Sequence, residues 1–360
     1  MTDLFSPYAI GSLALPNRVV MAPMTRARSS ADGIQGPMNA KYYAQRASAG
    51  LIITECVQIS PSSLGGVNQP GLMNPAQTEG WRGVTQAVHD AGGRIFAQLW
   101  HCGRASHSDF LHELPVAPSA LPATGAIFTP GGRKPYETPR ALELSEIAAI
   151  LRDFGAAAER AEDAGFDGVE LHGAFGYLPD QFLQSASNQR TDSYGGSLEN
   201  RARFMLAAVD ALTDVWGATR VGIKLSPSNR VNGMMDAHAA DTFGYLVQQL
   251  DRRSIGYVHL MEPSLKDIET GTVQIEHVTR LFRPMVRGAV ISNGGYNQAR
   301  ATAALADGLA DLVSFGVPYV ANPDLVERLR HDPVSLNTPD KATFYAGGAH
   351  GYTDYPALAA

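Results

Sequence analysis

Residues 165–190, GFDGVELHGAFGYLPDQFLQSASNQR, are the stretch of sequence that indicates the fold most clearly. A strand-like run, GFDGVELH, leads directly into a loop that holds His172 and Tyr177. A short run of this kind, bounded by glycine, is typical of a strand buried on both faces, as in a parallel sheet covered by helices. A histidine and a phenol at one strand end can bind a carbonyl group and supply a proton.

Seven further runs of the same kind are spread along the chain, and Ala-rich amphipathic stretches lie between them. Two of those stretches follow residues suited to cap a helix, Ser197 and Asn297, and another begins at Leu144. The eight predicted strands are VVMAP from Val19, LIITECVQI from Leu51, RIFAQLW from Arg94, GFDGVELH from Gly165, VGIKLSP from Val221, YVHLMEP from Tyr257, GAVISNGG from Gly288 and ADLVSFG from Ala310.

This alternation predicts an α/β fold, a single (β/α)8 TIM barrel, which needs roughly 250 residues. The chain has 360, so the surplus is expected in an N-terminal cap, an excursion after the third strand and a C-terminal extension. We predict one domain over residues 1–360, with a lid-like insertion at about 103–139, where proline and glycine are frequent, and the extension at about 332–360.

Composition narrows the function classes. Hydrophobic residues make up 44% of the chain, charged residues 18%, and the net charge is −6. No basic block is present, which argues against nucleic acid, and no apolar run approaches the roughly 18 residues of a membrane span. Cys56 and Cys102 stand at ends of predicted strands, which favours reduced thiols. We therefore expect a cytoplasmic protein.

A barrel carries its chemistry at the carboxyl ends of its strands, and the residues there are unusually polar. The glycines after the last two predicted strands suit a phosphate group. Together with Lys224 and Gln98 they indicate a phosphorylated planar cofactor over the barrel mouth. These strand-end residues are Pro23, Met24, Thr25, Glu55, Cys56, Gln58, Gln98, Trp100, His101, His172, Tyr177, Lys224, Ser226, Glu262, Asn293, Gly294, Gly295 and Gly316.

Plainer interpretations exist for several of these residues. A histidine at a strand end is more often structural than catalytic, and Tyr177 by itself could be a packing residue at the rim. Lys224 could form a Schiff base or a structural ion pair. The histidines near Cys102 fit no zinc spacing that we recognise, so no metal is predicted.

The chain resembles the Old Yellow Enzyme family of FMN-dependent NAD(P)H:ene reductases, also described as NADH:flavin oxidoreductases. The resemblance covers nearly the whole chain, and NQRTDSYGGSLENR is long and specific. The matching segments are LPNRVVMAPMTR from Leu15, YYAQRASAGLIITE from Tyr42, AQLWHCGR from Ala97, APSAL from Ala117, TPRALEL from Thr138, SNQRTDSYGGSLENRARF from Ser187, ANPDLVERL from Ala321 and GYTDYP from Gly351.

The resemblance implies a tightly bound, non-covalent FMN, NADPH or NADH as hydride donor, and a role for each matching residue. Lys224 stands where the family usually has an arginine beside flavin N1, a position that requires a cation. The other implied roles are a flavin hydrogen bond from Thr25, the pyrimidine edge at Gln98, main-chain contacts at Pro23, Met24 and Cys56, the phosphate end at Asn293, Gly294, Gly295, Gly316 and Val317, substrate anchoring by His172, proton donation by Tyr177, and an aromatic contact at the pocket mouth from Tyr352.

Two positions depart from the family pattern. The family loop has a second histidine or an asparagine three residues after its histidine, whereas HGAFG places Phe175 there as a substrate-binding residue. The family motif FGR is FGVP here, so Val317 replaces an arginine at the phosphate. Backbone amides, or a cation from elsewhere in the chain, must then meet the phosphate charge.

The implied reaction is ping-pong. The nicotinamide reduces FMN and leaves, and hydride then passes to the β-carbon of an activated alkene such as an α,β-unsaturated carbonyl, a maleimide or a nitroalkene. Tyr177, with a pKa of about 10 if unperturbed, stays protonated and donates to the α-carbon. The alternatives are reduction of nitrate esters or nitroaromatics on the same flavin, and a flavin-free lyase or ligand-binding barrel. The expected partners are small molecules only, and the protein is expected to be a monomer or a homodimer.

Overall fold

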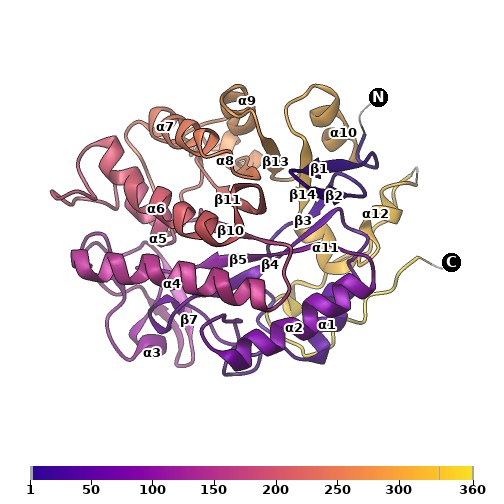
Figure 1. Cartoon of the computed structure of the whole chain (residues 1–360), viewed down its shortest axis with the longest axis horizontal. Helices are drawn as coiled ribbons and strands as arrows, with labels where there is room; N and C mark the ends of the chain where they lie inside the picture. Colours follow the sequence, from indigo (N-terminus) through magenta and orange to yellow (C-terminus); the bar gives the residue numbers. More distant parts are fainter. Residues whose placement is uncertain (1–2, 332, 359–360) are drawn as a thin grey trace.

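Eight parallel strands close into a barrel in the computed structural model, which describes residues 3–331 and 333–358. The strands follow one another around the barrel in chain order, and the last pairs with the first. All eight predicted strands are confirmed, and with them the (β/α)8 barrel (Figure 1). They are β3 (Val19–Met21), β4 (Leu51–Gln58), β5 (Ile95–Trp100), β10 (Gly168–Gly173), β11 (Val221–Leu225), β12 (Tyr257–Met261), β13 (Ala289–Asn293) and β14 (Leu312–Phe315).

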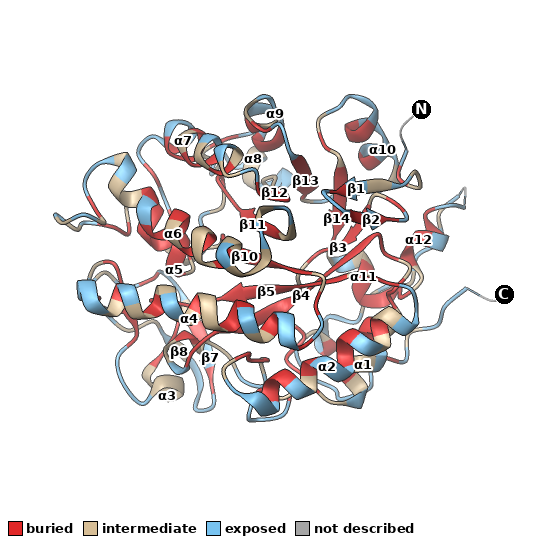
Figure 2. Ribbon diagram, viewed as in Figure 1, coloured by how far each residue is buried: buried red, intermediate tan, exposed pale blue. Residues whose placement is uncertain are grey.

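Helices surround the barrel and bury one face each against it. Figure 2 shows α2 and α4 with a buried side toward the strands and an exposed side toward solvent. The predicted caps are confirmed, because the side chains of Ser197 and Asn297 accept hydrogen bonds from the first turns of α6 and α10. The helices of the outer layer are α1 (Pro37–Ala44), α2 (Pro75–Asp90), α4 (Leu144–Asp163), α6 (Leu198–Trp216), α7 (Ala239–Arg252), α9 (Val278–Phe282), α10 (Gln298–Ala306), α11 (Val317–Ala321) and α12 (Leu325–Arg328).

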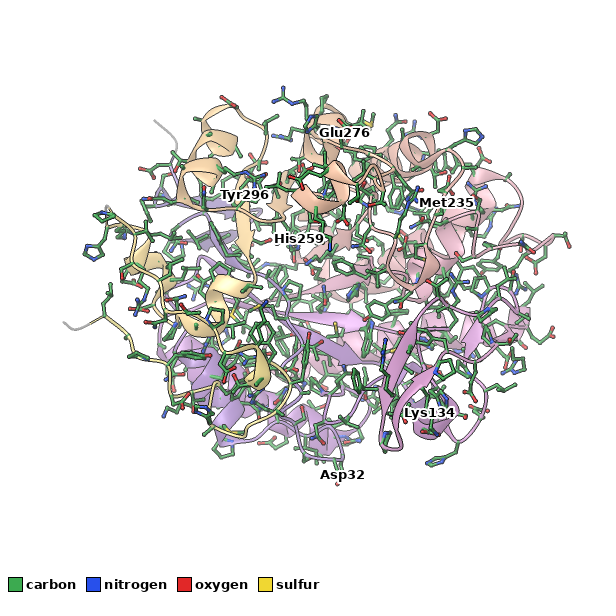
Figure 3. All side chains as sticks on the ribbon, turned by 180° about the vertical axis from the view of Figure 1, so that it is seen from behind. Asp32, Lys134, Met235, His259, Glu276 and Tyr296 are labelled. Atoms are coloured by element: carbon green, nitrogen blue, oxygen red, sulfur yellow. The ribbon has the colours of Figure 1, made fainter. Side chains whose placement is uncertain are left out.

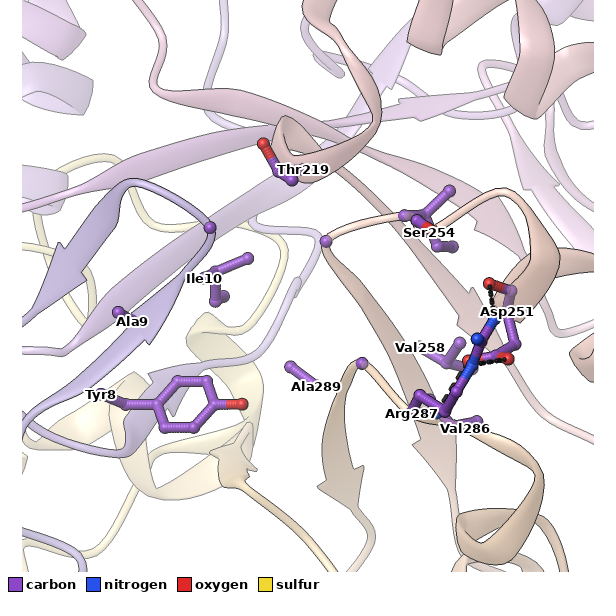
Figure 4. Close-up of a pocket in the computed structure, with 14 residues that line it drawn as sticks. Tyr8, Ala9, Ile10, Thr219, Asp251, Ser254, Val258, Val286, Arg287 and Ala289 are labelled. Carbon is purple, nitrogen blue, oxygen red and sulfur yellow. Dashed lines mark hydrogen bonds and ion pairs between the residues drawn. The ribbon is translucent and has the colours of Figure 1, made fainter.

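The amino-terminal end of the barrel is covered by a hairpin of β1 (Tyr8–Ile10) and β2 (Leu13–Leu15), the predicted N-terminal cap. Its apolar side chains join an interior cluster with Phe96 and Tyr257. A β-carbon at Gly222 would lie 2.1 Å from the Tyr257 ring, so glycine makes room for this ring inside the barrel. A cavity of about 420 Å³ lies between the hairpin and the strand starts, and Figure 4 shows the residues that line it. It lies at the end opposite the carboxyl ends of the strands.

The predicted excursion follows the third barrel strand, β5. It contains α3 (Ser108–Leu111), β6 (Val116–Ala117), β7 (Ala126–Thr129), β8 (Gly132–Pro135) and β9 (Arg140–Ala141), and β7 and β8 form an antiparallel hairpin. Two shorter helices, α5 (Leu178–Leu183) and α8 (Leu265–Glu269), follow β10 and β12. The lid-like role of the excursion and the domain limits stay predictions.

The segment near the C-terminus is tied to the loop that follows β3. The Arg28 guanidinium donates to the carbonyl oxygens of Thr343 at 2.6 Å and Gly348 at 2.9 Å, and Arg26 donates to that of Gly351 at 2.8 Å. Residues far apart in sequence therefore form one edge of the barrel mouth.

Among the residues described, no helix is both long and apolar enough to cross a membrane.

Candidate active site

The loop after β10 brings His172 and Tyr177 together, as predicted. Their ring centroids lie 4.8 Å apart, and the rings are nearly perpendicular. The Tyr177 ring also packs edge-to-face with Trp100, with centroids 5.0 Å apart. The phenol thus packs against two rings at the strand ends, which restricts its rotation.

The electrostatic surroundings fix the proton on each of these two groups. Burial, reinforced by the charge of Lys224, holds the pKa of His172 well below its usual range, so the ring is neutral at neutral pH. The main-chain N–H of Ala174 donates to its Nδ1 at 3.3 Å, which leaves the proton on Nε2. Burial raises the pKa of Tyr177 well above the usual value. Both side chains therefore offer a hydrogen-bond donor.

Phe175 has a left-handed backbone, with φ of 57°. Bulky residues rarely adopt this conformation, whereas asparagine does so readily. Its N–H donates to Ser226 Oγ at 2.8 Å, and its carbonyl accepts from Asn232 at 2.9 Å. Its ring lies 5.9 Å from that of His172 and 5.6 Å from Lys224 Nζ. An apolar ring thus occupies the position that the family pattern gives to a second donor.

Lys224 on β11 and Gln98 on β5 are both buried, and β10 lies between these two strands. Burial lowers the pKa of Lys224, and the carboxylate of Glu170 opposes this shift. Gln98 accepts a hydrogen bond from the Cys56 thiol at 3.3 Å and donates to Glu170 at 2.7 Å. Burial raises the pKa of Cys56 to about 12, so it stays a thiol and is no nucleophile. A hydrogen bond with Thr25 acts on the same thiol, which places the loop after β3 beside this group.

The predicted phosphate residues follow β13 and β14. A β-carbon at Gly294, where φ is 122°, would lie 2.9 Å from the carbonyl oxygen of Glu262, so only glycine fits. A cavity of about 460 Å³ opens beside Gly294 and Gly295, and Arg300 lines it. Val317 is 54% exposed.

Arg300 is a cation that the sequence did not single out. Its Nη1 donates to the carbonyl oxygen of Gly295 at 2.7 Å, and its guanidinium lies 5.2 Å from the centre of the Tyr296 ring. No ion pair joins it to an acidic side chain among the residues described.

Tyr352 does not lie at the pocket mouth, so that prediction is corrected. The side chain is completely buried and stacks on Tyr42 with ring centroids 4.0 Å apart, while its hydroxyl accepts from Asn39. Tyr345 is the exposed aromatic residue of this segment, at 65%, and it lies close enough to add to the raised pKa of Tyr177.

The donor set fits a flavin. A buried cation, an amide, a hydroxyl and two donors for a substrate surround the barrel mouth, and a glycine cradle follows its last strands. These features define the class: a (β/α)8 barrel that binds a phosphorylated redox cofactor at the carboxyl ends of its strands.

Comparison with known proteins agrees with this class. The model of the NADH:flavin oxidoreductase / NADH oxidase family matches residues 3–334, and the chain belongs to this family. It is 43% identical to 12-oxophytodienoate reductase 1 of Oryza sativa subsp. japonica over 359 residues, covering 99% of this chain and 93% of the relative. It is an FMN-dependent oxidoreductase of the Old Yellow Enzyme type, so the flavin-free alternative is wrong.

Two solved structures show the same architecture. Morphinone reductase in complex with tetrahydroNAD superposes with a TM-score of 0.93 and 48% identity, covering 99% of this chain and 98% of that one. The Old Yellow Enzyme homologue from Zymomonas mobilis gives a TM-score of 0.95 at 41% identity, covering 99% and 100%.

The carboxyl group of Asp180, at the base of the loop, makes stability depend on pH. Burial raises its pKa to about 7, and it accepts from Gly176 N–H at 2.9 Å and Gln184 Nε2 at 2.8 Å. Because the folded pKa exceeds the unfolded value of about 3.9, the folded state binds more protons between about pH 4 and 7. This contribution to stability is complete at pH 4 and is lost as the pH rises toward 7.

We expect Asp180→Asn to be more stable than the wild type at pH 8 and to approach it near pH 4. An amide has no charge to bury. Once the Gln184 amide turns, the new NH2 group can donate to Gln184 Oε1, which lacks a partner among the residues described, while the amide oxygen still accepts from Gly176 N–H. Urea unfolding between pH 4 and 8 measures this, with an expected gain of up to about 4 kcal/mol at pH 8. Parallel curves for the two proteins would contradict the assignment.

Proposed function

We propose that this enzyme uses NAD(P)H to reduce the carbon–carbon double bond of electron-poor alkenes. One observation carries the proposal: two neutral donors, His172 Nε2–H and the Tyr177 hydroxyl, lie side by side at the barrel mouth with ring centroids 4.8 Å apart. One donor can hold a carbonyl or nitro oxygen while the other supplies a proton to carbon. FMN, when bound, supplies the hydride.

The protein's own groups divide the remaining work. His172 Nε2–H polarises the substrate oxygen, and the Tyr177 hydroxyl protonates the α-carbon. Lys224, Gln98 and Thr25 hold the pyrimidine side of the flavin, as do main-chain groups at Pro23, Met24 and Cys56. Trp100 packs on Tyr177 and keeps the hydroxyl directed at the substrate.

The hydride donor is a nicotinamide coenzyme. The similar morphinone reductase was solved with tetrahydroNAD, which supports a nicotinamide at the same barrel mouth. The ping-pong order follows if coenzyme and alkene use one space, since they then cannot bind together.

Phe175 shapes the substrate class. With one donor replaced by an apolar ring, the oxygen of the substrate relies mainly on His172. We therefore expect maleimides and nitroalkenes, which need less polarisation, to react better than simple enones. The same property supports nitro compounds and nitrate esters as further acceptors.

We further propose that Arg300 supplies the cation that Val317 does not. Its Nη1 lies 2.7 Å from the carbonyl oxygen of Gly295, beside the proposed phosphate cradle formed with Gly294 and Gly316 and flanked by Asn293. A guanidinium has five donors, so one bond to a carbonyl leaves others for a phosphate.

The variant Val317→Arg tests this phosphate site. Charge-assisted hydrogen bonds are roughly twice as strong as neutral ones, so we expect FMN to be lost more slowly on dialysis. Arg300→Gln should lose FMN faster, and the double variant should recover part of that loss. Unchanged or faster loss from Val317→Arg, together with wild-type retention by Arg300→Gln, would contradict both assignments.

A direct experiment tests the proposed activity. Purified protein should be yellow, lose its colour anaerobically on addition of NADPH or NADH, and regain it when 2-cyclohexenone or N-ethylmaleimide is added. A flavin that is bleached but is reoxidised by neither alkene would exclude the ene reductase activity. Parallel tests with a nitrate ester and a nitroaromatic compound compare the alternative acceptors.

A further inference from the structure

A chain of buried polar side chains crosses the interior of the barrel next to the site. It joins Gln98 on β5, Glu170 on β10, His259 on β12 and Ser314 on β14, all of which are at most 1% exposed. Glu170 Oε1 lies 2.7 Å from Gln98 Nε2, and Oε2 lies 2.9 Å from His259 Nδ1. His259 Nε2 lies 2.8 Å from Ser314 Oγ. Figure 3 shows His259 near the centre of the molecule.

The hydrogen bonds along this chain have one consistent direction. Burial lowers the pKa of His259, more than Glu170 raises it, so its ring is neutral at neutral pH. Nδ1–H then donates to the carboxylate of Glu170, and Nε2 accepts from the hydroxyl of Ser314. A carboxylate held by two donors keeps one orientation.

This direction also fixes the amide of Gln98. Because Nε2 donates to Glu170, Oε1 faces the Cys56 thiol at 3.3 Å. The flipped amide would place two oxygen acceptors against each other. The pyrimidine edge of a flavin alternates acceptors with one N–H donor, so an amide held at a fixed position beside that edge can pair with it in only one orientation.

The same carboxylate acts on the cation of the site. Lys224 lies beside His259 and His172 in the strand register. The Glu170 carboxylate raises the pKa of Lys224, against the larger effect of burial. Glu170 stands two positions before His172, on the same face of β10. The carboxylate and the ammonium group are therefore opposite charges buried on two paired strands of the barrel.

We propose that Glu170, oriented by His259, is a positioning residue of the flavin site, which sets the amide direction of Gln98 and balances the charge of Lys224. This inference rests on the proposed roles of Gln98 and Lys224. It predicts two separable effects, one on FMN retention and one on the reduction potential of the bound flavin.

Two variants separate these effects in the holoenzyme. Glu170→Gln removes the negative charge and lets the Gln98 amide turn. We expect FMN release to be about 10-fold faster, as for loss of a hydrogen bond to a charged group, and the flavin potential to become more positive. Glu170→Asp keeps the charge, but its shorter side chain moves the carboxylate away from Gln98. FMN release should therefore be faster, while the reduction potential of the flavin stays near the wild-type value.

Ser292→Ala is the matched control. Ser292 is a buried serine of β13 whose hydroxyl bonds to Thr279 and Tyr296 and makes no hydrogen bond to Gln98, Glu170, His259 or Ser314. Both readouts should stay at wild-type values in this variant. Where Glu170→Gln folds poorly, Glu170→Asp and His259→Asn carry the test, and both should release FMN faster.

Wild-type FMN release and potential in the folded Glu170 variants would overturn the proposal, as would equal changes in Ser292→Ala. If every variant folds poorly, the reduction potential of the fraction that still binds FMN decides. A wild-type potential in that fraction would also overturn the proposal. Alkene reduction by the wild-type protein is measured separately, so failure of this inference leaves the proposed function standing.

Discussion

Tyr177→Phe should slow alkene reduction by about 10²- to 10⁴-fold while reduction of FMN by NADPH stays nearly unchanged. The range is that of general acid catalysis by one positioned group. Burial keeps the Tyr177 hydroxyl protonated, and the ring packs on both His172 and Trp100, so the substitution removes the proton donor and changes the shape of the side chain little. Stopped-flow spectroscopy separates the two half-reactions through the flavin absorbance.

Tyr136→Phe is the matched control for this prediction. Tyr136 is near enough to contribute to the raised pKa of Tyr177, but it belongs to the excursion after β5 and is not assigned a proton-transfer role. Equal losses in both half-reactions of Tyr177→Phe would mean that Tyr177 shapes the pocket and transfers no proton.

Phe175→Asn should raise enone turnover by about 10²-fold, because a preorganised oxyanion donor contributes about 10²- to 10³-fold. Asparagine also tolerates the left-handed backbone at this position, with φ of 57°, better than phenylalanine does. The gain should be smaller for maleimides, which depend less on polarisation. The effect is measured from the steady-state rates with both acceptors. The FMN content and the rate of FMN reduction by NADPH should be the same in the variant and the wild type.

Phe175→Leu distinguishes a new donor from a larger pocket. It removes the ring without adding a hydrogen-bond donor. A higher enone turnover in Phe175→Asn alone supports the missing donor. Equal gains in Phe175→Asn and Phe175→Leu would mean that the larger pocket causes the effect. If the enone rate and the product stereochemistry of Phe175→Asn match those of the wild type, another group already supplies the second hydrogen bond.

The barrel could be predicted because each of its strands and helices is recognisable from a short stretch of sequence. Each strand is a short apolar run that is buried on both faces, so its residue types alone distinguish it from the amphipathic helices between. The strand ends then follow from topology, which is why His172, Tyr177 and Lys224 could be expected toward the carboxyl ends of β10 and β11, where the structure has them.

The errors and omissions arose where distant segments meet. Tyr352 was assigned to the mouth from its motif, but Tyr42 and Arg28, more than 300 positions earlier, enclose its ring. The contact between Glu170 and His259 spans 89 positions. Polar residues at alternate positions of a buried strand, as at Glu170 and His172, were the one signal in the sequence that could have revealed it.

The most direct test of the account is the fate of the transferred hydrogen. With NADPH or NADH deuterated at the reactive C4 position and 2-methylcyclohexenone as acceptor, the account predicts one deuterium at the β-carbon of the product and a solvent proton at the α-carbon. In Tyr177→Phe the product should carry the same label but form more slowly. Oxidation of the nicotinamide without deuterium in the reduced alkene, from protein that holds FMN, would contradict the central claim.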